Sequence, residues 1–249
     1  MKNRKLLCFT LFILFTLTNI TSVYCQNNDD KTLYNWFDNK FCKENLDINN
    51  GSIHLNYDKT LNNENRYFED QNAFVAGNVN YEEQDYFDVN LKYDILNDEL
   101  ILNPKNVESN YIGINLNKEK IKSFSINKKT FVNLSAPTLP PDFAKGFYQE
   151  SIVGKSFTFY IKHYKQKSEL IKDYGVFSKY TYKTEFILSF KNKFEEMSSK
   201  KSITNQFPEY KKKISDFYVM NEYLEKENKI KFMENLMIYI NNLQNSETK

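Results

Sequence analysis

Apolar and polar residues alternate most regularly between positions 86 and 102 of the chain. In the first half of this stretch every second residue is apolar, at Phe87, Val89, Leu91, Tyr93 and Ile95. A period of two predicts a β-strand with one buried face and one solvated face. Asn97 and Asp98 suit a two-residue turn, because both residue types tolerate positive φ. The predicted hairpin pairs Ile95 with Leu100 and Tyr93 with Leu102, so that the apolar faces coincide.

Further short strands follow at close spacing, with no helical pattern between them. They are expected over residues 74–81, 112–116, 121–126, 147–152, 156–164, 176–182 and 185–190, with a last short strand ending at 197. Gly77 weakens the first of these strands or marks a bulge. A turn at Asn127 and Lys128 would bring Phe124 opposite Phe131. The order predicts an antiparallel meander over residues 73–197, curved into a half-barrel or sandwich-like sheet.

The hydrophobic period changes after Met197. Ser199 can cap a helix that runs to about Phe207, and Pro208 suits the first turn of the next helix. Apolar residues then form two helical stripes, at Tyr210, Ile214, Phe217 and Tyr218 and, in a helix from about Lys229, at Phe232, Met233, Leu236, Met237, Ile240 and Leu243. We therefore predict an α+β fold, mostly antiparallel β, whose curved meander sheet is closed by two to three C-terminal helices over residues 198–244. Residues 26–72 would be a partly irregular N-terminal extension, and residues 245–249 a disordered tail.

Residues 1–25 have the pattern of a secretory signal peptide. Lys2, Arg4 and Lys5 form a basic start, and the uncharged apolar run that follows, about 15 residues, is short for a membrane span of roughly 20. Val23 and Cys25 suit the small-residue positions before a signal-peptidase cut. The alternatives are a lipoprotein signal that is acylated at Cys25 and an uncleaved signal anchor. We expect an exported protein without a transmembrane span after cleavage, located in the periplasm, at the periphery of the outer membrane or outside the cell.

Removal of the signal changes the charge and the cysteine count. The chain carries 34 Lys and Arg against 32 Asp and Glu, and the cut would leave 31 bases against 32 acids. Arg66 would be the single remaining arginine, which disfavours nucleic acid as a partner because arginine makes most bidentate phosphate and base contacts. Cys42 would be the single remaining thiol, so no intramolecular disulfide is expected.

Four stretches of the chain carry a resemblance to other proteins. They are "GNVNYEEQDYFDVNLKYDILNDELIL", "KEKIKSFSINKKTFVNL", "GFYQESIVGKSFTFYIKH" and "FEEMSSKKSITNQFPEYKKKISDFY". In this order they resemble exported β-rich proteins of Bacteroidota, flavobacterial in type and of uncharacterised function, over about residues 50–241. The resemblance implies an envelope or secreted location in a diderm bacterium and carries no catalytic residue. It departs at Val153 and Gly154, where a turn former such as Asn or Asp is expected before the glycine.

Few residues offer catalytic chemistry. The chain has no phosphate-binding glycine loop and no metalloprotease or serine-hydrolase motif. His163, at the end of an alternating strand, is a candidate general base or metal ligand, although a half-buried and hydrogen-bonded histidine is the simpler interpretation. Glu150 lies between Tyr148 and Ile152, and burial would raise its pKa unless a one-residue bulge turns it outward. Asp94 is a third candidate, but the alternation places it on the solvated face. No cofactor and no metal is predicted.

Two classes of function fit this pattern. The first is a non-enzymatic, exported binding or structural module that contacts an envelope protein or a lipid, with a lipid or acyl-chain carrier in a half-barrel groove as its sharper form. The second is a secreted hydrolase that uses carboxylates from separate loops.

Overall fold

The computed structural model describes residue 32 and residues 47–104, 113–135, 139–140, 142–191 and 193–247. The predicted signal peptide, with Cys25, and the single mature thiol Cys42 lie outside these residues. One antiparallel sheet of 11 strands runs through the described chain in the order β1-β5-β4-β3-β2-β6-β7-β8-β9-β10-β11. The strands are β1 (Ser52–Ile53), β2 (Val75–Tyr81), β3 (Gln84–Asp94), β4 (Glu99–Asn103), β5 (Ile114–Asn115), β6 (Ile121–Ile126), β7 (Lys129–Leu134), β8 (Gly146–Val153), β9 (Phe157–Lys172), β10 (Gly175–Phe190) and β11 (Lys193–Glu196).

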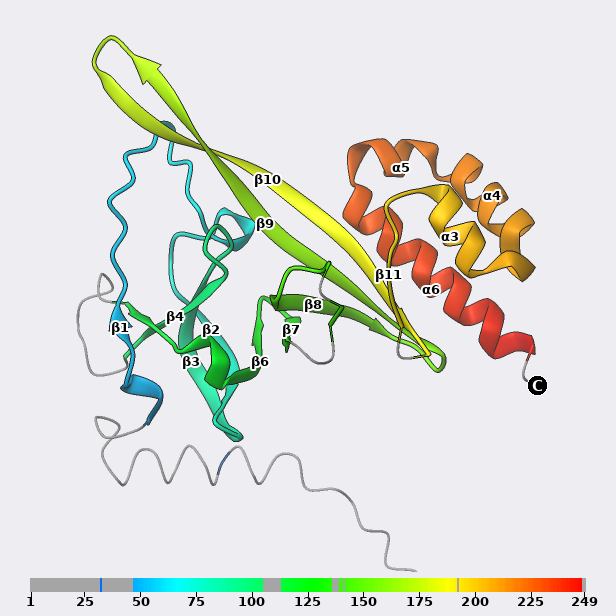
Figure 1. Cartoon of the computed structure of the whole chain (residues 1–249), viewed down its shortest axis with the longest axis horizontal. Coiled ribbons are helices and arrows are strands. Elements are labelled where there is room, and N and C mark those ends of the chain that lie inside the picture. Colours follow the sequence, from blue (N-terminus) through cyan, green and yellow to red (C-terminus); the bar gives the residue numbers. More distant parts are fainter. Residues whose placement is uncertain are drawn as a thin grey trace, which may run out of the picture.

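The sheet is curved and open, and helices pack at one end of it (Figure 1). Strands β2 to β5 follow one another outward, and the chain then returns to the other side of β2 to begin β6. From β6 to β11 each strand pairs with the next in the sequence. The predicted fold class, a mostly antiparallel meander closed by C-terminal helices, is confirmed.

The β3–β4 hairpin differs from the prediction by two residues. Tyr93 pairs with Leu100, and Leu91 pairs with Leu102. The turn is longer than expected because the carboxylate of Asp94 accepts hydrogen bonds from the backbone N–H groups of Leu96 and Asn97, at 2.9 and 3.2 Å. A shift of two residues leaves the side chains from Val89 onward on their predicted faces, because the side-chain period of a strand is two. Before Val89 the prediction is wrong, since Tyr86 and not Phe87 is buried.

Three other predicted turns and bulges are confirmed. Phe124 pairs with Phe131 across the turn at Asn127 and Lys128. The β2–β3 register shifts between Gly77 and Val79, where Phe87 and Asp88 of β3 lie opposite the single residue Asn78. A second register shift, between Glu150 and Ile152, is the one-residue bulge that the sequence left open beside Glu150.

The β9–β10 hairpin is much longer than predicted. Each strand has 16 residues, and the pairs run without a register shift from Phe157–Phe190 to Lys172–Gly175. The break predicted between residues 182 and 185 is wrong, and β9 continues eight residues beyond its predicted end at 164. The outer half was missed because residues 165–172 are mostly polar on both faces, so no alternation signals a strand. The hairpin extends far beyond the other strands (Figure 1).

Aromatic side chains fill a first core, on the curved part of the sheet. Phe68, Tyr93, Phe124, Phe131 and Phe147 make ring-to-ring contacts with centroids 4.8–6.1 Å apart. Such offset and edge-on pairs add to the free energy gained by burial. The concave face is therefore packed by protein side chains at this point.

A second core lies between the base of the long hairpin and the helices α3 (Lys200–Gln206), α4 (Lys211–Met220), α5 (Glu222–Glu227) and α6 (Lys229–Glu247). Ser199 caps α3 by accepting the N–H of Ser202 at 3.1 Å, and Pro208 begins the short 3₁₀ turn before α4, both as predicted. The predicted stripe of α6 is buried, with Phe232, Leu236 and Ile240 inaccessible to solvent. Helix α6 ends three residues beyond the predicted limit at 244. None of the described helices is both long and apolar enough to span a bilayer.

Candidate functional site

His163 lies between the two cores and is almost fully buried. Its Nε2 is 2.8 Å from Oε1 of Gln149, whose amide nitrogen in turn faces Glu234 Oε1 at 3.3 Å. Because Gln149 Oε1 is then an acceptor, Nε2 of His163 carries the proton, and Nδ1 accepts the hydroxyl proton of Tyr182. Burial lowers the pKa of His163 to about 3. Both ring nitrogens are occupied, so the expected hydrogen-bonded histidine is confirmed, but it is almost fully buried and not half-buried as predicted.

A cleft of about 430 Å³ opens beside this histidine, between the sheet and the start of α6. Its charged lining residues are largely paired with one another: Lys129 contacts Glu69 at 2.6 Å, and Lys165 contacts Asp70 at 2.6 Å. Glu234 accepts a hydrogen bond from Ser151 as well as from Gln149. The cleft is thus polar, and its size is within the range of small-molecule sites.

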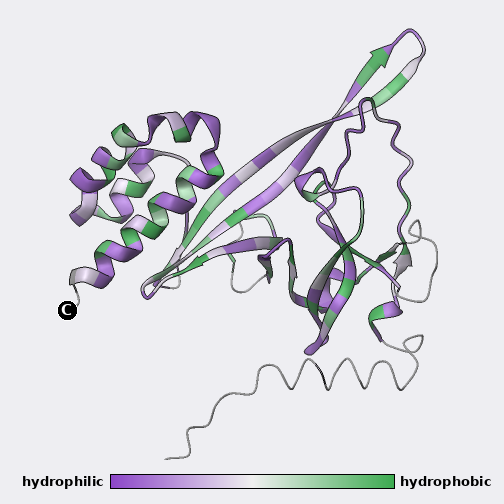
Figure 2. Ribbon diagram, turned by 180° about the vertical axis from the view of Figure 1, so that it is seen from behind, coloured by the Kyte–Doolittle hydropathy of each residue, from purple (hydrophilic) through white to green (hydrophobic). Residues whose placement is uncertain are grey.

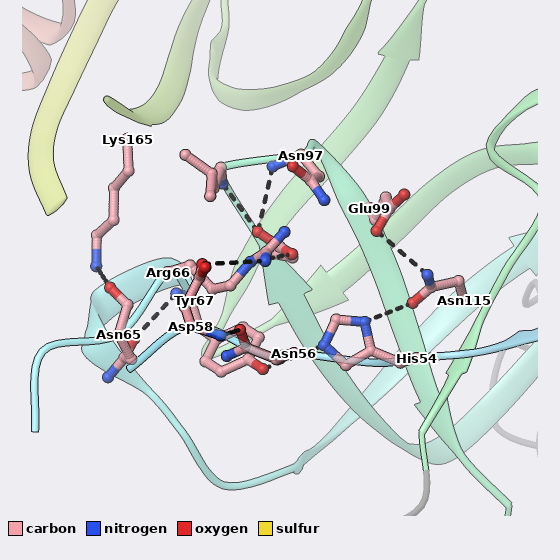
Figure 3. Close-up of polar contacts among 12 residues, drawn as sticks. His54, Asn56, Asp58, Asn65, Arg66, Tyr67, Asn97, Glu99, Asn115 and Lys165 are labelled. Carbon is pink, nitrogen blue, oxygen red and sulfur yellow. Dashed lines mark hydrogen bonds and ion pairs between the residues drawn. The ribbon is translucent and has the colours of Figure 1, made fainter. Parts of the chain in front are cut away.

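Asp94 is fully buried, which corrects the prediction that it lies in water. Its Oδ2 is 2.7 Å from Nε of Arg66, a residue that is itself nearly buried (Figure 3). Residues 54–67, which precede β2, cover the face of the β3–β4 hairpin that the alternation alone suggested was solvated. Burial raises the pKa of Asp94, and the Arg66 guanidinium and two backbone N–H groups oppose that rise. The pair is a structural link between this N-terminal segment and the hairpin turn.

His54 joins the same cluster from the beginning of the segment (Figure 3). Asn115 donates its amide N–H to Glu99 at 3.2 Å, so its Oδ1 accepts the Nδ1–H of His54 at 2.8 Å. The hydroxyl of Tyr67 lies 3.2 Å from Nε2 and donates to it. Burial is the main cause that lowers the pKa of His54.

The ligand atoms of His54, Asp94 and Glu99 lie within 4.8 Å of one another, close enough to share a metal ion. The surroundings do not suit a cation, because Asp94 already faces the Arg66 guanidinium at 2.7 Å. A metal ion beside that fixed positive charge would be repelled. Both nitrogens of His54 also have partners.

Asp98 is the centre of a second buried charge cluster that the sequence did not reveal. Its Oδ2 contacts Lys162 at 3.0 Å and also contacts Lys118, and it accepts the backbone N–H of Phe147 at 3.2 Å. The hydroxyl of Tyr93 donates to Oδ1 at 2.5 Å. Lys162 and Lys118 are the main charges that hold the pKa of Asp98 below its usual value, against the effect of burial. With both carboxylate oxygens engaged, Asp98 links the β3–β4 turn to β8 and β9 rather than offering a free carboxylate.

Glu150 is half-buried at the register shift in β8, opposite Tyr160. Its neighbours Gln149 and Ser151 both point toward Glu234 on α6. The three predicted catalytic candidates therefore have separate surroundings: the hydrogen-bonding or pairing partners of His163, of Asp94 and of Glu150 have no residue in common. The structure does not bring them together as one reactive group.

The outer end of the β9–β10 hairpin, residues 166–180, is the other candidate site. Ile171, Tyr174 and Val176 are 76%, 73% and 53% exposed. Hydrophobic positions lie on both strands at this end (Figure 2). Leu170 and Phe177 pair on the opposite face from Ile171 and Val176, so both faces of the ribbon carry apolar side chains. Exposed apolar side chains gathered at one place are typical of contact surfaces.

The N-terminal segment holds this outer half from one side. Asp58 contacts Lys167 at 2.5 Å and accepts the hydroxyl proton of Tyr180 at 2.5 Å. The backbone of Ser178 donates to the carbonyl of Lys59 at 2.7 Å. Arg66 lies 3.6 Å from Asp58, so the Asp94 cluster and the hairpin are connected through one carboxylate. In the sequence, Arg66 was distinguished only as the single arginine expected after signal cleavage.

No protein-family model, curated protein or solved structure matches this chain. Function is therefore argued from the residues themselves.

Proposed function

We propose that the protein is an exported, non-enzymatic binding or structural module that makes its contact through the outer half of the β9–β10 hairpin. The observation that carries the proposal is the exposure of Ile171, Tyr174 and Val176 at the end of this ribbon. A two-stranded ribbon that packs on nothing is only marginally stable in water. A partner that covers its exposed apolar end would therefore stabilise it. The export expectation rests on the sequence of residues 1–25.

The buried polar groups support a role without catalysis. His163 has both ring nitrogens hydrogen-bonded within the chain, Asp98 has both carboxylate oxygens engaged, and Asp94 is buried beside the Arg66 guanidinium; each joins elements that are distant in sequence. A general base needs a free lone pair within reach of substrate. The hydrolase alternative would require carboxylates across a cleft, and those of the described cleft, Glu69, Asp70 and Glu234, are already engaged by Lys129, Lys165 and Ser151.

The carrier alternative has less support from the described residues. A groove for an acyl chain would need apolar walls, whereas the cleft beside α6 contains six charged side chains and the aromatic residues of the first core contact one another. Native mass spectrometry of the purified protein would test it directly, because a bound lipid adds a discrete mass.

Site-specific photocrosslinking in cells that naturally produce the protein tests the proposal. A benzophenone amino acid replaces Tyr174 at the end of the hairpin, and a matched variant carries it at Tyr223, which is 79% exposed on α5. We expect a discrete adduct from position 174 that is absent from position 223. The absence of any adduct from position 174, or adducts from position 223 alone, would overturn the proposal.

A further inference from the structure

The outer edge of β9 is an unpaired sheet edge. Pairing with β8 ends at Ile161, and Lys165 then donates its N–H to the carbonyl of Ile95 at 3.1 Å. Among the described residues, no strand lies beside this edge from Gln166 to Lys172. The opposite edge, on β10, is partly covered by Lys59 and Thr60. Unpaired N–H and C=O groups of this kind are a template for another strand.

The direction of the free backbone groups follows from Lys165. Its N–H points away from β10, and the β9–β10 register is continuous, so every second residue from Lys165 points the same way. The outward groups therefore belong to Lys167, Glu169 and Ile171. The N–H groups of Ser168 and Leu170 point into the hairpin.

This edge is self-complementary in one register. When two copies lie antiparallel with Leu170 opposite Leu170, the outward residue Glu169 of each faces the outward residue Ile171 of the other. Lys167 then faces Asp173 of the second copy, which pairs opposite charges. Because Leu170 is opposite Phe177 in its own hairpin, a continuous apolar row Phe177–Leu170–Leu170–Phe177 forms across four strands.

The same register fits the length of the free edge. Its last pair joins Lys167 to the turn residue Asp173, so the ladder ends before Lys165, whose N–H is already bonded to Ile95. The bodies of the two copies would lie at opposite ends of the paired hairpins. Lys165, where each body begins, would be separated from Lys165 of the second copy by about 33 Å along the ladder, which keeps the bodies from colliding.

A membrane suits this ribbon less well than a second strand. The apex of the hairpin carries Lys172 and Asp173, and both would be the first groups buried if the ribbon entered a bilayer end-on. Charged side chains in hydrocarbon are costly. In edge-to-edge pairing they stay at the border of the sheet, in contact with water.

We propose that a second copy of this chain is the partner, added to the outer edge of β9 about a two-fold axis at Leu170. This inference rests on the proposed function, since it names the partner of the same ribbon. The contact is smaller than a standard interface of roughly 800 Å² per partner, so the dimer should form in a concentration-dependent way.

Sedimentation velocity over a concentration series measures the dimer. Glu169→Pro removes one outward N–H and leaves the β9–β10 ladder intact, because proline is tolerated on an edge. Val176→Pro is the matched control, since Val176 pairs with Ile171 and presents its N–H to the outer edge of β10. We expect the wild type and Val176→Pro to dimerise alike and Glu169→Pro to stay monomeric, with unchanged circular dichroism.

Disulfide formation tests the register. In a background with Cys8, Cys25 and Cys42 replaced by serine, Leu170→Cys should form a dimer under mild oxidation, because a directly opposed non-hydrogen-bonded pair brings the two thiols together. Ser168→Cys, on the same face, would face Lys172 of the second copy and should not crosslink.

Three results would overturn the inference: a monomer at every concentration, a dimer that survives Glu169→Pro, or equal crosslinking from positions 168 and 170. A monomer whose position 174 still yields a discrete adduct in cells would remove the second copy as partner and leave the proposed binding function standing. Lipid vesicles that bind the monomer would assign the ribbon to a membrane instead.

Discussion

The β9–β10 hairpin divides into an inner half, residues 157–164 with 183–190, and an outer half, residues 165–182. Both halves have the same unbroken backbone register. In the inner half, Phe159 and Leu188 face each other without solvent exposure, covered by the C-terminal helices. In the outer half, Glu169 faces Ser178 and none of the described helices lies over the ribbon (Figure 1). The same backbone pairing thus occurs both in a buried half and in an exposed half of one hairpin.

This difference shows what each kind of interaction contributes. Backbone hydrogen bonds set the register but add little net free energy, because the unfolded chain bonds to water instead. Burial of apolar surface makes the inner half part of a core. The outer half keeps its form through the register and through contacts with the N-terminal segment, which leaves its apolar end available.

Truncation of one aromatic side chain in each half should give the largest contrast. Phe159→Ala removes a fully buried ring stacked on Phe186 and is expected to lower the free energy of unfolding by about 3–5 kcal/mol. Phe177→Ala, in the partly exposed outer half, should cost less than about 1 kcal/mol. Urea denaturation measures both, and equal losses would show that the outer half is packed as tightly as the inner half.

The border between the halves should be sensitive to pH through His163. Its pKa of about 3 in the folded chain lies below the ordinary 6.5, so between these values the unfolded chain binds a proton that the folded chain does not. The stability from neutral His163 is therefore complete above pH 6.5 and is lost as pH falls toward 3. From pH 7 to 4.5 the loss should be about 3 kcal/mol.

Urea denaturation at the two pH values checks this expectation. His163→Gln has no charge to gain, so its free energy of unfolding should fall by less than that of the wild type over the same interval. His54→Gln measures the separate contribution of His54, whose pKa burial also lowers although the side chain is only half-buried. The same pH dependence in wild type and His163→Gln would contradict the assignment.

A smaller effect, on amide hydrogen exchange, is expected when the contacts between the N-terminal segment and the outer half are weakened. Asp58→Asn weakens the contacts to Lys167 and Tyr180 and should increase amide hydrogen exchange over residues 166–180 while residues 157–161 stay protected. Asp216→Asn, at an exposed position of α4, is the matched control and should leave both regions unchanged. Faster exchange in the inner half as well would mean that the hairpin opens as one unit.

Much of the fold could be read from local patterns. The alternation of β3 from Val89 onward, the turn at Asn127, the cap at Ser199 and the stripe of α6 each depend on neighbours within a few residues, and each is confirmed. The main wrong predictions concerned strands made of polar residues. The outer half of β9 carries polar residues on both faces, so its sequence shows no apolar alternation. Backbone pairing with β10 makes it a strand, and that pairing cannot be read from the pattern of β9 alone.

The candidate sites were less predictable than the fold. The hydrogen-bonded burial of His163 followed from its place at the end of an apolar strand face, but its partners Gln149 and Tyr182 come from other strands. Asp94 was misplaced for a related reason. A single strand pattern cannot show that a segment from residues 54–67 will cover the polar face and bring Arg66 to it.

The sequence by itself determined the antiparallel sheet, the helical C-terminus and the turn chemistry, because these follow from side-chain periods of 2 and 3.6 residues and from local backbone preferences. Only the tertiary structure decided which charges are buried, how far the long hairpin extends and which of its edges stays open. Those features depend on contacts between residues as far apart as Asp58 and Tyr180, and no local pattern encodes such contacts.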